Sequence, residues 1–261
     1  MRVIRTSINT QEPVSIVPFF DLHIGSPKCK LQSIKDAIQT VRTNPNCFAV
    51  IGGDIIDNST KDSIGDTYTE TMSPMDQIRY AAALFEPIKS KILCVTSGNH
   101  ERRSYKKAGV DLVLVGFADA LGITHLYDPA GCLIDLSLGL CQRGRGRNRN
   151  PVNYTMYITH GDGNSGRTVG GKANGLSKRS DVVDADVYIT GHTHMPVAFK
   201  ESKCFYDRTH KKLRNKDVLF VNAASFLNYE QYAELMGLPP SSTSTPLITL
   251  SAASFEATCV L

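Results

Sequence analysis

Five short apolar runs in this sequence are each followed within three residues by histidine, aspartate or asparagine. The runs are VSIVPFF, CFAVI, KILCVTS, NYTMYIT and DVYIT, and the segments after them are DLH, GGDIIDN, GNHE, HGD and GHTH. Short apolar runs bounded by glycine or polar residues predict buried strands. Because strands of an open α/β sheet present their carboxyl ends to one crevice, we expect these polar residues to gather in a single site.

Amphipathic segments separate the strands of the first half of the chain. Residues 31–42 carry apolar side chains at helical spacing, namely Leu31, Ile34, Ala37, Ile38 and Val41. Ser73 followed by Pro74 is typical of a helix start and predicts a helix to about residue 87. We also expect helices at 109–122, 174–184 and 228–237. Strands that alternate with helices predict βαβ units and a mainly parallel sheet.

The second half is richer in strands, and we expect it to form a second sheet. The predicted fold class is therefore α/β, a four-layer α/β/β/α sandwich of two mixed sheets flanked by helices. A chain of 261 residues that is 41% hydrophobic can bury a large core. We expect one domain over residues 1–261.

Composition excludes several classes of protein. The seven cysteines are scattered and form no C-x-x-C pair, which argues against a disulfide framework and favours a reducing compartment. No run approaches the ~18–20 apolar residues of a membrane helix, and the first residues lack a signal peptide's apolar core. We expect a cytoplasmic protein with no membrane partner. The net charge of +4 does not by itself indicate nucleic acid.

The polar residues after the strands are typical metal ligands. Five of the seven histidines lie there: His23, His100, His160, His192 and His194. Asp21 and His23 are two residues apart, as are His192 and His194, so on an extended chain each pair would face one side. Histidine, aspartate and asparagine together favour Mn²⁺, Fe or Zn²⁺ over Ca²⁺. Any one of these histidines alone would be structural, but the set exceeds the needs of one tetrahedral ion and favours two neighbouring ions.

In order, the motifs read D-x-H, G-D-x-x-D, G-N-H-[ED], H-G and G-H-x-H. This set, from Asp21 to His194, resembles the calcineurin-like metallophosphoesterase superfamily. Residues 222–238 are loosely similar to small prophage-type and DNA-repair-exonuclease-like members. The resemblance implies two divalent ions, most often Mn²⁺ with Fe or Zn²⁺ as alternatives, joined by Asp54 and a hydroxide. One ion would be held by Asp21, His23, Asp54 and His194. The other would be held by Asp54, Asn99, His160 and His192.

The resemblance also implies roles for residues that do not bind metal. His100 would protonate the leaving oxygen or stabilise the transition state as a cation. Asp57 would orient His100 and keep it protonated, although an aspartate here can also stabilise a turn. We expect substrate contacts from Asn99, Arg102 and Arg167, with a structural ion pair as the alternative for Arg102.

Two basic stretches bear on the substrate. Residues 142–151 carry four arginines at alternate positions, and residues 163–180 form a glycine-rich segment that we expect to act as an active-site flap. A solvated hairpin loop is the alternative for residues 142–151. Few aromatic residues lie between these cations, so base stacking is not indicated.

The hypothesis is a dinuclear phosphodiesterase or nuclease whose substrate is a phosphate ester, DNA or RNA included. The alternatives are a cyclic-nucleotide phosphodiesterase, a phosphomonoesterase and a non-catalytic scaffold. Asn58 stands where calcineurin-type Ser/Thr phosphatases carry Arg-Gly, which argues against that activity. The oligomeric state is left open, a homodimer included.

Overall fold

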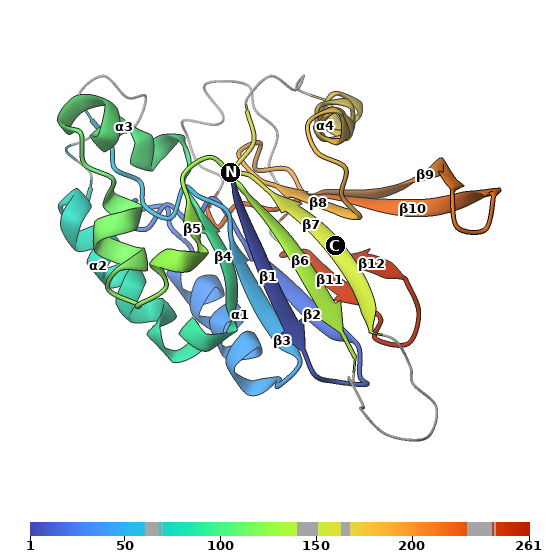
Figure 1. The fold of residues 1–261 in the computed structure, drawn as a ribbon. Helices are drawn as coiled ribbons and strands as arrows, with labels where there is room; N and C mark the ends of the chain where they lie inside the picture. The colour runs from blue at the N-terminus through green and yellow to red at the C-terminus, as the bar shows by residue number, and fades with distance from the viewer. Residues whose placement is uncertain (61–67, 69, 140–150, 163–167, 229–241, 243) are drawn as a thin grey trace.

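Two six-stranded mixed sheets face each other between flanking helices, as the sequence predicts (Figure 1). The structure is a computed structural model, and it describes residues 1–60, 68, 70–139, 151–162, 168–228, 242 and 244–261. Within these ranges no helix is both long enough and apolar enough to cross a membrane.

The first sheet has the strand order β12-β11-β2-β3-β4-β5. Its parallel part comprises β2 (Val14–Phe19), β3 (Cys47–Ile51), β4 (Ile92–Thr96) and β5 (Tyr127–Asp128). The antiparallel strands β11 (Leu247–Leu250) and β12 (Ala257–Val260) complete it beside β2. The parallel strands all run toward the same edge, and that edge carries three of the polar segments.

The second sheet has the order β1-β6-β7-β8-β10-β9. Its strands are β1 (Arg2–Ile8), β6 (Cys132–Leu138), β7 (Val152–Ile158), β8 (Val187–Thr190), β9 (Val197–Asp207) and β10 (Lys212–Asn222). We expected the second half of the chain to build this sheet. That expectation was wrong for the first strand of the chain and for its last two strands. β1 joins it by pairing with β6, whereas β11 pairs with β2 of the first sheet. An apolar pattern identifies a strand, but the free sheet edge that it meets decides its partner.

Helices α1 (Leu31–Thr43) and α2 (Pro74–Phe85) form where the periodicity predicts them. The apolar face of α1 buries Ile34, Ile38 and Val41. At the start of α2 the Ser73 side chain accepts a hydrogen bond from the Asp76 amide, so the predicted cap is confirmed. A 3₁₀ turn, η1 (Glu86–Lys91), continues α2 as far as β4.

Other helices differ from the prediction. Helix α3 (Asn99–Ala108) was not expected, because its sequence NHERRSYKKA offers almost no apolar stripe. The segment expected as a helix at 109–122 is helical only over residues 112–118, of which η2 (Leu114–Ala118) is a short π-helix, and the 3₁₀ turn η3 (Thr124–Leu126) follows. Helix α4 (Val169–Ser177) begins five residues before the expected 174, because Thr168 caps it, and it runs into η4 (Lys178–Asp181). The helix expected at 228–237 lies outside the described residues except for Asn228.

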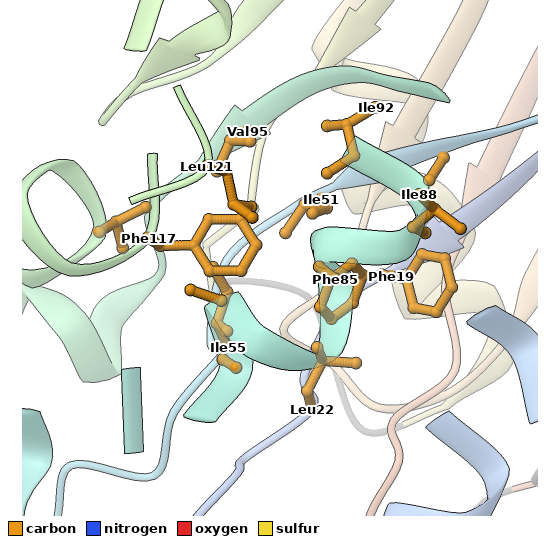
Figure 2. Close-up of a cluster of buried hydrophobic side chains, with 14 of the residues drawn as sticks. Phe19, Leu22, Ile51, Ile55, Phe85, Ile88, Ile92, Val95, Phe117 and Leu121 are labelled. Carbon is orange, nitrogen blue, oxygen red and sulfur yellow. The ribbon is translucent and has the colours of Figure 1, made fainter. Parts of the chain in front are cut away.

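Three apolar clusters hold the layers together. The first lies between the first sheet and helices α1 and α2, and Figure 2 shows part of it. In this cluster the rings of Phe19 and Phe85 pack edge to face, with 5.0 Å between their centroids. A second fills the space between the two sheets. A third covers the outer face of the second sheet, where the ring of Tyr188 stacks on that of Phe220 with 4.8 Å between their centroids. The resulting rigid core fixes the strand ends that carry the polar residues.

Candidate metal centre

The polar residues from both sheets meet at one end of the sandwich. Asp21 and His23 follow β2, Asp54 and Asp57 follow β3, and Asn99 and His100 follow β4, all from the first sheet. His160 follows β7, and His192 and His194 follow β8, all from the second sheet. The site therefore straddles the two sheets, and residues up to 171 positions apart come into hydrogen-bond contact.

Three groups of side chains have donor atoms close enough to share a cation. They are Asp21 with His23 and His194, His23 with Asp54 and His100, and Asp54 with His160 and His192; within each group the atoms lie within 4.8 Å of one another. The two histidines of GHTH thus fall into different groups. Asn99 joins the third group through its Oδ1, 3.1 Å from His160 Nε2. The first and third groups contain residues of the two ligand sets that the resemblance implies, whereas the second group joins His100 to His23 and Asp54.

The backbone at these positions is not extended. Asp21, His23, Asp54, His192 and His194 all have positive φ, between 48° and 66°. The expectation that Asp21 and His23 face one side of an extended chain was therefore wrong, although both side chains do reach the same group. Left-handed backbone at a non-glycine residue costs about 1–3 kcal/mol and persists only where the surroundings enforce it. Amide hydrogen bonds from Asp21 to Gly53 and from His192 to the Asp21 carboxylate do so here.

Gly53 illustrates how tightly the loops pack. It lies between β3 and Asp54 with φ of 92°, and an added Cβ would come within 2.4 Å of the Gly98 nitrogen. Only glycine permits this approach of two backbones. The contact keeps the loop that carries Asp54 against the start of α3.

Three buried side-chain atoms of the described residues lack a hydrogen-bond partner, one of them Thr96 Oγ1, and the other two belong to this site. These two are Asp21 Oδ1 and His23 Nε2, which belong to residues only 0% and 2% exposed. Buried polar atoms are almost always hydrogen-bonded, and buried carboxylates need a compensating charge. A divalent cation would satisfy both atoms, and the mixed oxygen and nitrogen donors suit Mn²⁺, Fe or Zn²⁺. The residues present therefore fit the metal ions that the ligand pattern implies.

Charges within the cluster shift each other's protonation. Burial alone would raise the pKa of Asp54, but the neighbouring His160, His100 and His23 hold it well below its usual value. Burial disfavours a charge on His160, yet Asp54, 3.2 Å away, together with Asp21 and Glu101 raises the His160 pKa to about 9. At neutral pH the metal-free chain therefore keeps a proton where a metal would bind.

Metal affinity is expected to rise with pH for this reason. Below pH 9 an incoming ion must displace the His160 proton, so the dissociation constant should fall about tenfold per pH unit and level off above 9. Titration calorimetry with Mn²⁺ between pH 7.0 and 8.5, in buffers of different ionisation enthalpy, measures both the affinity and the released proton. A constant affinity over this range would contradict the assignment, and exposed His125 offers a control substitution, His125→Ala, that should leave the slope unchanged.

His100 and Asp57 contact each other through the main chain. His100 Nδ1 donates to the main-chain carbonyl of Asp57, whereas the Asp57 carboxylate bonds His23 Nδ1 at 3.0 Å and Ser59 Oγ at 2.9 Å. Burial and the neighbouring His23 lower the His100 pKa to about 4. Asp57 thus orients His100 through its backbone and His23 through its side chain. We expected Asp57 to keep His100 protonated. The lowered pKa of His100 in the metal-free chain does not agree with that expectation.

Glu101 supports the site, although the sequence reasoning gave it no role. It is 1% exposed, and its carboxylate accepts hydrogen bonds from the amides of Gly98 at 2.8 Å, Asp54 at 3.0 Å and Ile56 at 3.0 Å. These bonds fix the loop that presents Asp54 to the start of α3. A glutamate three residues into a helix is the signal that could have found it.

Replacing Glu101 with glutamine should lower both stability and metal affinity. The amide group can accept only on one side, so it would point an N–H at another N–H and lose about 2 kcal/mol of unfolding free energy. Misplacing Asp54 should also weaken Mn²⁺ binding at least about tenfold. Urea unfolding and Mn²⁺ titration measure the two effects, with exposed Glu86→Gln as the control. Unchanged metal affinity would show that Glu101 does not position Asp54.

Asn222, at the end of β10, holds the GHTH turn. Its side-chain nitrogen donates to Thr193 Oγ1 at 2.9 Å and to the Met195 carbonyl at 2.7 Å, while its oxygen accepts from Thr190 at 2.9 Å. It fixes the turn from which His192 and His194 diverge. Nothing in the local sequence marks it, because its partners come from a different strand.

The remaining predicted residues have these placements. Arg102 is exposed and donates to the Pro129 carbonyl at 2.7 Å. Arg167 lies outside the described residues, as does all of the basic loop 142–151 except Pro151. The described part of the expected flap, 168–180, is helix α4 and η4, in which Arg179 pairs with Asp162 at 2.6 Å.

A two-sheet α/β sandwich with this aspartate and histidine cluster at its strand ends defines a metallophosphoesterase. The family model of calcineurin-like phosphoesterases matches residues 21–196, which is more than half of the chain, and the chain belongs to this family. The match spans all the motifs from Asp21 to His194.

Solved structures of similar fold come from varied organisms. Vacuolar protein sorting 29 of Cryptosporidium parvum is 13% identical over 95% of this chain and 97% of its own, with a TM-score of 0.44. A predicted phosphoesterase of Streptococcus pneumoniae is 13% identical over 96% and 91%, with a TM-score of 0.40. A metallophosphoesterase of Sphaerobacter thermophilus is 9% identical over 94% and 86%, with a TM-score of 0.42. No curated protein matches the sequence.

Proposed function

We propose that this chain is a dinuclear metal-dependent phosphodiesterase that acts on nucleic acid or nucleotides. The observation that carries the proposal is the pair of adjacent donor groups, Asp21 with His23 and His194, and Asp54 with His160 and His192. Two cations held this close need an anionic ligand between them, and buried Asp54 has contacts that fit this role.

The proposed ligand sets follow the two groups. Asp21, His23, Asp54 and His194 would hold one ion. Asp54, Asn99, His160 and His192 would hold the other, with Mn²⁺ favoured in both. When bound, such ions polarise phosphate oxygens and lower the pKa of water, which is the chemistry that hydrolysis requires.

The chain's own groups would then orient the ester and move a proton. The hydrogen bond from His100 Nδ1 to the Asp57 carbonyl aims Nε2 at the cluster, 3.7 Å from Asp54 Oδ2. An anionic phosphate ester beside this ring favours its protonated form, from which Nε2 can give a proton to the leaving oxygen. Asp57 positions the ring, and its carboxylate holds His23 in place.

The preference for a polynucleotide or nucleotide rests on the arginines of residues 142–151. Four guanidiniums within eight residues suit repeated phosphates better than a single small ester. In this proposal the chain is a single cytoplasmic domain, with the segment 163–180 beside the substrate, where Arg102 and Arg167 add contacts. The basic loop joins Leu138 of β6 to Val152 of β7, at the opposite end of β7 from His160, so its arginines would contact the distant phosphates of a long substrate.

A panel of substrates tests the proposal. The Mn²⁺-loaded protein is assayed on bis-p-nitrophenyl phosphate and p-nitrophenyl phosphate, then on single- and double-stranded DNA and RNA, then on cyclic nucleotides. Cleavage of the small diester and of polynucleotides supports the proposal. Activity on the monoester alone would replace it with a phosphomonoesterase, and activity on cyclic nucleotides alone would indicate a cyclic-nucleotide phosphodiesterase. No hydrolysis of any ester would indicate a non-catalytic scaffold.

A further inference from the structure

Arg103 is a cation at the rim of the candidate metal centre that the sequence motifs do not single out. Its Nη1 donates to the main-chain carbonyls of Asp57 at 3.1 Å and Asn58 at 3.2 Å. Its Nη2 lies 3.0 Å from His100 Nε2. The side chain is half-buried, so it is anchored by protein on one side and open on the other.

Helix α3 places Arg103 beside His100. The two residues are three positions apart in the helix and therefore lie on the same face. The start of this helix is held firmly, because Glu101 accepts from the Gly98 amide and Asn58 Nδ2 donates to the His100 carbonyl at 2.7 Å. The guanidinium is thus positioned before any ligand arrives.

The hydrogen bonds of His100 place this guanidinium near the candidate metal ligands. Nδ1 of His100 donates to a carbonyl, so in the neutral ring Nε2 carries no proton and accepts from Arg103. The same Nε2 lies 3.7 Å from Asp54 Oδ2. Because both contacts share one ring atom, Nη2 of Arg103 lies no more than 3.0 plus 3.7 Å, or 6.7 Å, from Asp54 Oδ2.

The guanidinium has donors to spare. Both hydrogens of Nη1 are used by the two carbonyls, whereas Nη2 has a second hydrogen and Nε has one, for which the described residues provide no acceptor. No carboxylate is paired with Arg103 among the described residues, so its full positive charge is directed at the site. Phosphate oxygens are the ligands that a fixed guanidinium binds best.

We propose that Arg103 is an anion-binding position of this site and takes a non-bridging oxygen of the substrate phosphate. The inference rests on the proposed function for the identity of the substrate, but not for the binding itself. The phosphate oxygen can take the second Nη2 hydrogen or the Nε hydrogen, neither of which is used by the contact with His100 Nε2.

The test compares two variants of Arg103 with a control on the same helix. Arg103→Met removes the charge and the hydrogen-bond donors. Arg103→Lys keeps the charge but loses the planar arrangement of N–H donors. Exposed Lys106→Gln removes one positive charge from the next turn of α3. For each protein, titration calorimetry measures the dissociation constant of inorganic phosphate with and without Mn²⁺, and kinetics on bis-p-nitrophenyl phosphate give KM and kcat separately. Metal content and urea unfolding establish that the ions and the fold are retained.

For Arg103→Met the phosphate dissociation constant should rise about 10- to 100-fold, since one charge-assisted hydrogen bond is lost. The KM of Arg103→Met should rise by a comparable factor. For Arg103→Lys, both constants should lie between those of the parent and those of Arg103→Met. For Lys106→Gln, both constants should stay within about twofold of the parent. If Arg103→Met changes only the unfolding midpoint while both constants stay within about twofold, Arg103 is a structural clamp and the inference is overturned. Failure of the parent protein to bind phosphate overturns it as well. If the parent binds phosphate through Arg103 but hydrolyses no ester, only the proposed function fails.

Discussion

Replacing Asp54 with alanine is expected to remove both metal ions and to lower phosphoesterase activity at least about a thousandfold. Asp54 belongs to two donor groups at once, and its Oδ1 also accepts from the His100 amide at 2.9 Å. Metal ions contribute several kcal/mol of transition-state stabilisation, and about 1.4 kcal/mol corresponds to a factor of ten. Without the shared carboxylate, the positive charge of two neighbouring ions has no ligand between them to offset it.

Elemental analysis of the purified protein, before and after dialysis against Mn²⁺, measures the ions retained by Asp54→Ala. Asp54→Asn keeps the shape of the side chain without its charge and should also lose metal. Asp135→Ala, which removes a carboxylate from the exposed face of β6, serves as the control and should keep the metal content of the parent. Retention of both ions by Asp54→Ala would show that Asp54 does not hold them jointly.

Replacing His100 with asparagine is expected to keep both ions and to slow cleavage about 10²- to 10⁴-fold. Asparagine can still donate to the Asp57 carbonyl, so the local backbone should remain in place. It cannot transfer a proton to the leaving oxygen. The loss should therefore be large for diesters with alkoxide leaving groups and small for those with nitrophenolate, which departs without protonation.

A series of diesters whose leaving groups differ in pKa measures this dependence. The slope of log kcat/KM against leaving-group pKa should be steeper for His100→Asn than for the parent. His125→Asn, outside the site, should reproduce the parent slope. Equal losses across the series would indicate that His100 acts as something other than a proton donor.

The residues of the candidate site could be predicted from sequence because each follows an apolar strand. Asp21, Asp54, His160 and His192 all lie within three residues of a strand end, where the sheet itself brings them together. The layered α/β class could be predicted for the same reason, since apolar periodicity records which face of an element is buried. Helix α3 could not, because it is held by its capping contacts and by Asn58 rather than by an apolar stripe.

The residues that support the site could not be predicted from the sequence, for a related reason. Glu101, Arg103 and Asn222 act through backbone groups of other segments, such as the Asp54 amide and the Asp57 carbonyl. Backbone groups are the same at every position, so the sequence does not show which of them a side chain will meet. The pairing of β1 with the second sheet and of β11 with the first was hidden in the same way.

By itself, the sequence determined which side chains can bind metal in this protein: aspartate, asparagine and histidine at the ends of buried strands, and hence the family. Only the tertiary structure decided which of these residues lie together in each group of possible metal ligands. His192 and His194 reach different groups because both have left-handed backbone, and that conformation is held by contacts such as the bond from the His192 amide to Asp21. A local pattern specifies which atoms are available, but the distance between atoms 171 residues apart depends on the packing of the whole sandwich.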